Sequence, residues 1–170
     1  MKTVTRALVV RSVDYKDSDK ILTLLTPDMG KLSAGARGCR KKGSAIAAAC
    51  QLLCWSELVL SDRGGKWSVS EASTLREFLG VRRDLDKLAL ACYFAEMAEV
   101  LSVEGMPSPG LLSLTLNSLH ALECLDRPPE QIKAAYQEQG YSIVAFTDHR
   151  RYENHTQLND EGFLALAALE

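Results

Sequence analysis

The sequence predicts an α+β protein with a small amino-terminal β-barrel, an α-helical domain behind it and a short tail of α/β character. Three observations predict this order. Short apolar runs bounded by turn residues fill the first 80 residues, helical spacing of apolar residues follows, and a strand-type run returns near residue 141. The expected domains are therefore 1–80, 81–136 and 137–170.

Five apolar runs in the first half are typical of strands, and they cover residues 4–13, 20–26, 31–37, 51–60 and 66–70. The sequence PDMG at 27–30 predicts a tight turn, because proline presets its own dihedral angle and glycine tolerates a positive one. The sequence SDRGG at 61–65 predicts a second turn. Five short strands that close on themselves fit a small barrel.

Helical spacing begins after Gly80. Apolar residues occupy most of the circumference of segment 85–101, which predicts a buried core helix. A second helix is expected to start at Ser108 and Pro109, which suit a cap and a first turn, and leucines at 112, 116, 119 and 122 form its core stripe. A third helix is expected over 130–139, between two prolines and Gly140.

The tail changes pattern again. The run YSIVAF at 141–146 indicates a buried strand entered from a helix, and FLALAALE at 163–170 fits either a helix or a strand. Asp148 and His149 follow the strand, and His155 and Glu170 lie further on. These residues are too few for the three or more ligands that a catalytic metal site usually needs, so no metal or other cofactor is expected.

The composition favours a cytoplasmic protein. No apolar stretch reaches the ~18 residues that cross a bilayer, and the start MKTVTRALVV does not resemble a secretory signal. The five cysteines lie mostly in apolar segments, which indicates reduced thiols. Cys50 and Cys54 form a CxxxC pair without a second pair nearby, so two buried small residues are expected there.

Charge separates the two halves. Up to Gly80 there are 13 Lys and Arg against 8 Asp and Glu, and after it there are 7 against 14. The positive half contains a glycine-flanked basic loop, RGCRKKGS, with Arg37, Arg40, Lys41 and Lys42. A flexible basic loop can follow a phosphate backbone and so bind nucleic acid. The alternative is that the loop only increases solubility.

Other positions extend or limit this hypothesis. Lys31, Arg63 and Lys66 lie in or beside the expected hairpins and could continue the basic track. The aromatic residues that could stack bases are Tyr15, Trp55, Trp67 and Phe78, although a single aromatic residue in a strand usually belongs to the core. No catalytic residue is expected in the first 130 residues, where His120 is the single histidine and reads as structural.

The segments ALVVRSVDYKDSDKILTLLTPDMGKLSAGARGCRKKGS, CQLLCWSELVLSDRGGKWSVSEA and REFLGVRRDLDKLALACYFAEMAEVL resemble the RecO family of bacterial recombination mediators over residues 1–136. The resemblance implies an OB-fold, a helical domain and a non-enzymatic DNA repair protein that binds single- and double-stranded DNA. It further implies strand annealing, recombinase loading, and RecR and single-strand-binding protein as partners. The DNA contacts would fall on Arg37, Arg40, Lys41 and Lys42, and also on Lys31, Arg63 and Lys66.

Residues 134–170 resemble instead a fragment of the PHP family of metal-dependent phosphoesterases, through a helix, a strand, a TDH turn and a later glutamate. The resemblance implies His149 and Glu170 as metal ligands, but the preceding HxH motif is absent. A divalent-metal phosphoesterase using Asp148, His149 and Glu170 is therefore the alternative function. A protein-binding adaptor without DNA contact is a further alternative.

Overall fold

The computed structural model describes residues 2–124, 137–138, 143–148, 159–161 and 164–169. The chain divides into two compact units, Met1–Cys124 and Leu125–Glu170. The first unit holds a barrel and the helices, and the second holds a pair of strands. The sequence-based boundary at residue 80 therefore falls inside one compact unit.

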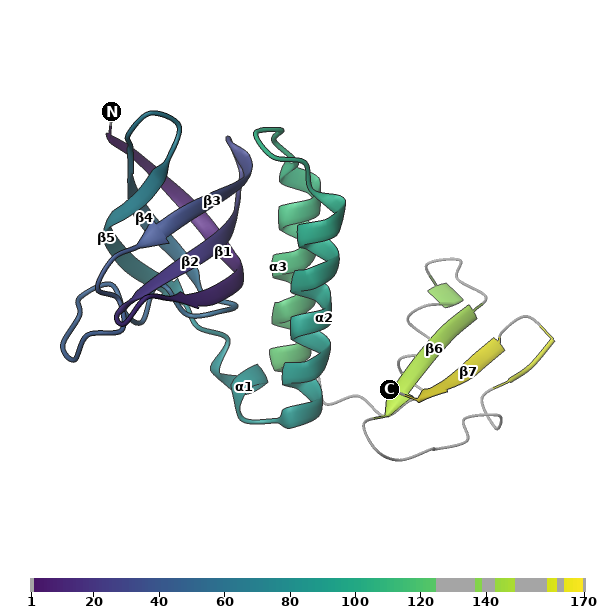
Figure 1. The fold of residues 1–170 in the computed structure, drawn as a ribbon. Helices are drawn as coiled ribbons and strands as arrows, with labels where there is room; N and C mark the ends of the chain where they lie inside the picture. The colour runs from purple at the N-terminus through teal and green to yellow at the C-terminus, as the bar shows by residue number, and fades with distance from the viewer. Residues whose placement is uncertain (1, 125–136, 139–142, 149–158, 162–163, 170) are drawn as a thin grey trace. The chain divides into compact units, whose positions relative to one another are not determined.

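Five strands form a closed barrel in the order β1-β2-β3-β5-β4, and β4 pairs back with β1 (Figure 1). Neighbours are antiparallel except β3 and β5, which run in parallel at two register positions, Ala34 with Trp67 and Gly35 with Ser68. The strands are β1 (Lys2–Tyr15), β2 (Asp19–Thr26), β3 (Gly30–Ala36), β4 (Trp55–Asp62) and β5 (Trp67–Arg76). Five strands followed by helices are thus present, as the α+β prediction expects, although two of the strands have other bounds than predicted.

Both turns expected from the sequence are present, and side chains close them. The Thr26 hydroxyl accepts the Met29 N–H at 3.0 Å and donates to the Gly30 carbonyl at 2.9 Å. In the β4–β5 turn, the Asp62 carboxylate accepts the Gly65 N–H at 2.8 Å. These bonds satisfy backbone groups that the ladders leave unpaired, and so they set where each hairpin reverses.

The core has two parts that share β1 and β2. Ala7 and Val9 point into the barrel, whereas Leu8 and Val10 belong to a second cluster between the barrel and the helices. A strand buried on both faces needs a continuous apolar run rather than an alternating one, and residues 7–10 (ALVV) form such a run. Leu119 of α3, which is fully buried, is in the second cluster.

Three helices follow the barrel: α1 (Leu79–Arg82), α2 (Leu85–Leu101) and α3 (Pro109–Cys124). They pack against one side of the barrel (Figure 1). The Asp84 carboxylate caps α2 by accepting the N–H groups of Asp86 and Lys87 at 3.0 and 3.1 Å. The third helix expected over 130–139 is described only at residues 137–138, which are helical.

The prediction that α2 is a buried core helix is wrong. Its fully buried side chains are Ala91, Ala95 and Ala98, whereas Leu85 and Val100 are both 72% exposed. Small residues every three or four positions let the helix approach its neighbours closely. Only that flank is covered by the part of the chain that the structure describes.

The connection between α2 and α3 docks on the barrel at the start of β3. The Gly105 N–H donates to the Lys31 carbonyl at 3.1 Å, and the Lys31 ammonium donates to the Glu99 carbonyl at 2.7 Å. Gly30 lies so close to the backbone of the connection that a Cβ on it would be 2.1 Å from the Met106 carbonyl oxygen. Glycine is therefore required there.

In the second unit, β6 (Ile143–Asp148) and β7 (Leu164–Leu169) pair in parallel. The strand expected at 141–146 is thus present over its described residues, 143–146, and continues to Asp148. The segment 163–170, for which the sequence allowed either a helix or a strand, contains a strand over Leu164–Leu169. His149, His155 and Glu170 lie outside the described residues, as does the side chain of Asp148. Among the described helices, none is long and apolar enough to cross a membrane.

Candidate nucleic-acid interface

A groove of about 940 Å³ runs over β2 and β3, between the β1–β2 turn and the β4–β5 turn. Small residues line its middle: Ser33 and Gly35 on β3 and Ala36 at the end of that strand. Five cationic side chains also line the groove. They are Lys16, Lys20, Arg37, Arg63 and Lys66.

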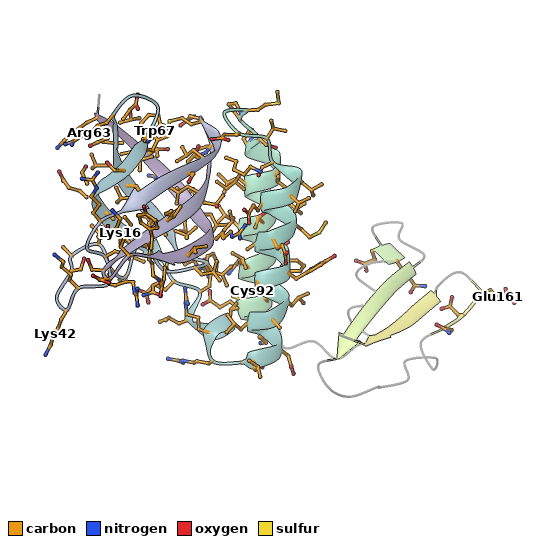
Figure 2. All side chains as sticks on the ribbon, viewed as in Figure 1. Lys16, Lys42, Arg63, Trp67, Cys92 and Glu161 are labelled. Carbon is orange, nitrogen blue, oxygen red and sulfur yellow. The ribbon has the colours of Figure 1, made fainter. Side chains whose placement is uncertain are left out.

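Barrel closure brings these cations together from three separate segments. Lys20 on β2 pairs with Ala36, so it lies beside Arg37, which follows β3 directly. The parallel pairing of β3 with β5 then places the β4–β5 turn, with Arg63 and Lys66, next to the same strand. In the view of Figure 2, Arg63 lies at one end of the barrel, Lys42 at the other and Lys16 between them.

The groove carries a clear excess of positive charge. Among the described residues, the five lining cations form no ion pair and no side-chain hydrogen bond. The lining acids are Asp19 and Glu104, and Asp19 already accepts the Gly38 N–H at 2.7 Å. Gathered, unpaired cations raise the local positive potential and attract polyanions.

The basic loop forms a second hollow of about 410 Å³ beside the groove. Arg40 and Lys41 line it, and Lys20 lines both hollows, so the two are adjacent. Arg40 is partly neutralised, because its guanidinium lies 3.2 Å from an Asp14 carboxylate oxygen. Lys42 is exposed at the outer side of the loop.

Hydrogen bonds hold the basic loop, which was expected to be flexible. The Arg40 N–H donates to the Ser18 carbonyl at 3.0 Å, and the Lys41 N–H donates to the Gly38 carbonyl at 3.0 Å. Cys39 between them is buried, and burial raises the pKa of its thiol. The loop therefore presents its cations from an anchored backbone beside the β1–β2 turn.

Lys31 does not join the other sequence-predicted site residues. Its ammonium hydrogen bond to Glu99 places it at the junction between β3 and the end of α2. There it satisfies one of the carbonyl groups that a helix leaves unpaired at its carboxyl end. The structure thus brings together Arg37, Arg63 and Lys66, with Arg40 and Lys41 in the adjacent hollow, and leaves Lys31 outside.

Lys16 and Lys20 are groove residues that the sequence reasoning missed. They belong to the segment DYKDSDK, in which acids outnumber bases, so no cationic signal was visible along the chain. In the folded molecule the acids are used elsewhere, since Asp14 pairs with Arg40 and Asp19 binds the Gly38 N–H.

The aromatic candidates separate in the same way. Trp55 and Phe78 belong to the cluster between barrel and helices, and Trp67 packs against the barrel core while lining the groove. Tyr15 lines the groove and is 47% exposed. Stacking on Phe78 is excluded by its burial, at 2% exposed.

The cysteines are free thiols, as expected. Burial raises the pKa of Cys50 to about 12 and also raises the pKa of Cys54. Both residues are buried, and the Cys54 thiol contacts the Ala48 carbonyl at 3.3 Å. Neutral buried thiols are poor metal ligands, because the thiolate is the binding form.

A different cluster on α3 contains ligand-type atoms. His120, Glu123 and Cys124 place theirs within 4.8 Å of one another. The Arg76 guanidinium stands among them, 2.8 Å from the His120 Nδ1 and 2.6 Å from a Glu123 oxygen. Burial acts to raise the pKa of Glu123, but hydrogen bonds from Arg76 and the Gly80 N–H bring that pKa below its usual value. This cluster already holds a cation, so it fastens α3 to β5.

Two family models match consecutive parts of the chain: "Recombination protein O N terminal" over residues 1–78 and "Recombination protein O C terminal" over residues 82–137. The chain belongs to the RecO family. Its groove is built almost wholly from the amino-terminal RecO match, and only Glu104 comes from the carboxyl-terminal one.

Curated RecO relatives agree with this assignment. The DNA repair protein RecO of Acetivibrio thermocellus is 34% identical over 142 residues, which are 84% of this chain and 57% of the relative. The corresponding protein of Desulforudis audaxviator is 39% identical over 119 residues, covering 69% of this chain and 47% of the relative. The chain therefore spans about half the length of these RecO relatives.

The comparisons do not support the phosphoesterase resemblance of residues 134–170. The carboxyl-terminal RecO model reaches residue 137. The DNA repair protein RecO of Salinibacter ruber is 29% identical over 171 aligned residues, which cover 96% of this chain and 64% of the relative. A RecO alignment thus extends into the segment for which a different family was expected.

Proposed function

We propose that this RecO-family chain acts in DNA repair and recombination by binding single- and double-stranded DNA along the groove over β2 and β3. The observation that carries the proposal is the set of five lining cations, which come from separate turns and strands and form no ion pair with any residue that the structure describes. We assign the barrel to the OB-fold class on its strand order. Barrels of that class bind oligonucleotides on the face of strands 2 and 3 and on the loops between strands 1 and 2 and strands 4 and 5.

Charge and shape both support this ligand. Each cation that neutralises a phosphate releases condensed counterions, which makes the affinity fall steeply with salt. The small side chains on β3 leave the floor of the groove low enough for a backbone to lie along it. Lys20 reaches both hollows, so a strand could pass from the groove to Arg40 and Lys41 without leaving positive surface.

We further propose the activities and partners that RecO membership suggests. These are strand annealing, loading of recombinase, and contacts with RecR and single-strand-binding protein in the cytoplasm. The relatives' printed names support the repair role, since all are called DNA repair protein RecO. The alternative phosphoesterase function has no support from the described residues, which exclude His149 and Glu170.

A pair of charge-matched variants tests the interface. Arg63→Ala/Lys66→Ala removes two groove cations, whereas Arg83→Ala/Lys87→Ala removes one arginine and one lysine from the helical region. Fluorescence anisotropy with a labelled oligonucleotide gives the affinity at several salt concentrations. We expect the groove variant to flatten the slope of log affinity against log salt by about 1.4 and the control variant to leave it unchanged. Equal slopes in both variants would refute the groove as the DNA interface.

A further inference from the structure

The β1–β2 hairpin presents large apolar side chains to water inside the cationic groove. Tyr15 is 47% exposed and Ile21 is 39% exposed, and both line the groove. Val13, which is 46% exposed, stands directly opposite Ile21 in the ladder and two residues before Tyr15. Single exposed apolar residues are ordinary on protein surfaces, but adjacent ones in a groove mark a binding site.

Lys16 places its charge against this apolar surface. Its Nζ lies 5.2 Å from the centroid of the Tyr15 ring, within the range of a cation–π interaction. Lys16 has a φ of +52°, in the left-handed region that residues with a side chain rarely adopt. Such backbone conformations cluster at ligand-binding sites. The turn therefore holds a ring and an ammonium group side by side.

On the side of the groove away from the β1–β2 hairpin, the residues of β3 and β5 leave room for a flat group such as a base. Trp67 lines the groove from β5, and Gly35 lies on the strand between Trp67 and the hairpin. A Cβ added to Gly35 would meet its nearest atom, the Trp67 carbonyl oxygen, at 4.0 Å. The groove thus combines phosphate-type cations with an aromatic ring and an open floor.

We propose that Tyr15, supported by Ile21, is a stacking position for the unpaired bases of a single strand, so that the groove recognises bases as well as phosphates. This inference rests on the proposed DNA-binding function and adds its ligand class at this site. In a duplex the base faces are covered by neighbouring bases, and only a single strand can offer them to a ring. The surrounding cations favour such a polyanion over an apolar protein segment.

The test compares two single strands that differ only in their bases. One probe is a labelled oligothymidylate, and the other is an abasic deoxyribose-phosphate strand of the same length. We expect the wild-type chain to bind the base-bearing strand more tightly. Tyr15→Ala should weaken that binding by about 5- to 100-fold and leave the abasic strand unaffected, because stacking on an aromatic ring contributes for each base. Tyr15→Phe should retain most of the preference.

A matched control is Val4→Ala, since Val4 is 65% exposed on the same strand and does not line the groove. It should change neither affinity. Equal affinity of the wild-type chain for both strands, or an equal loss on both from Tyr15→Ala, would overturn the stacking site while leaving phosphate binding intact. Failure of the wild-type chain to bind any strand would instead overturn the proposed function and this inference with it.

Discussion

Replacing Gly30 by alanine should release the α2–α3 connection from the barrel. The added Cβ would lie 2.1 Å from the Met106 carbonyl oxygen and 2.4 Å from its carbon. Both are backbone atoms and cannot rotate away, so the connection itself must move. The contacts at risk are the Gly105 N–H bond to the Lys31 carbonyl and the Lys31 ammonium bond to Glu99.

The size of the effect follows from these contacts. Gly30 has a φ of +65°, and a side chain in that conformation costs about 1 kcal/mol. Loss of a backbone hydrogen bond adds about 1 kcal/mol, and weakening of a charged one adds about another 1 kcal/mol. The free energy of unfolding should therefore fall by about 3 kcal/mol.

Gly43→Ala is the control for backbone strain alone. Gly43 has a φ of +79°, and a Cβ there meets nothing within 4 Å, so the cost should be about 1 kcal/mol. Urea unfolding followed by tryptophan fluorescence should place the midpoints of the two variants about 1 M apart, for a slope of about 2 kcal/mol/M. Coincident midpoints would show that the close approach at Gly30 does not hold the connection in place, and the reasoning would be wrong.

The other predictions concern the helices and the thiols. Leu119→Ala should lower the free energy of unfolding by about 2 to 5 kcal/mol, because the Leu119 side chain is fully buried. The control is Leu114→Ala on the same helix, which should lower it by less than about 0.5 kcal/mol because Leu114 is 64% exposed. Comparable urea midpoints of the two variants would contradict this prediction. The pKa of Glu123 is lower in the folded chain than its usual value, so the ionised carboxylate stabilises the fold at neutral pH. Glu123→Gln should therefore have a lower free energy of unfolding than the wild-type chain at neutral pH, and this difference should vanish as the pH falls from about 4.5 through the folded pKa. A difference that does not change with pH would contradict the prediction. A thiol reagent at pH 8 should modify the exposed Cys124 in the native chain. Cys50 is buried and has a pKa of about 12, so it should react only after denaturation. Equal reaction rates of the two thiols in the native chain would refute this prediction.

Local patterns predicted most elements of the first unit, and the deviations have tertiary causes. The expected strand 51–60 begins only at Trp55, because residues before it form turns in which Leu53 takes a φ of +64° and is buried. The expected strand 66–70 continues to Arg76, since β4 offers it a partner along its whole length. Pairing partners, which lie far away in the chain, therefore decided where these strands start and stop.

In helix α2, too, the sequence pattern predicted the element and tertiary packing decided its environment. Its apolar residues predicted a helix correctly, but they could not tell which flank would be covered. Alanines are the least conspicuous apolar residues in such a pattern, yet Ala91, Ala95 and Ala98 are the ones that pack, because close approach depends on small volume. Tyr93 and Met97 on the same helix stay exposed, at 51% and 38%.

The amino-acid sequence alone specified the succession of strands and helices and the presence of a basic loop, because both are visible in spacing and composition along the chain. The family followed from the resemblance of whole segments to RecO proteins. The shared groove arose only on folding, when barrel closure placed Lys16 and Lys20 beside Arg63 and Lys66, more than 40 residues away. The packing of α2 beside the barrel placed the Lys31 ammonium against the carboxyl end of that helix instead. The charge pattern of a sequence reports only residues that are neighbours along the chain, whereas a binding surface depends on which distant strands lie side by side.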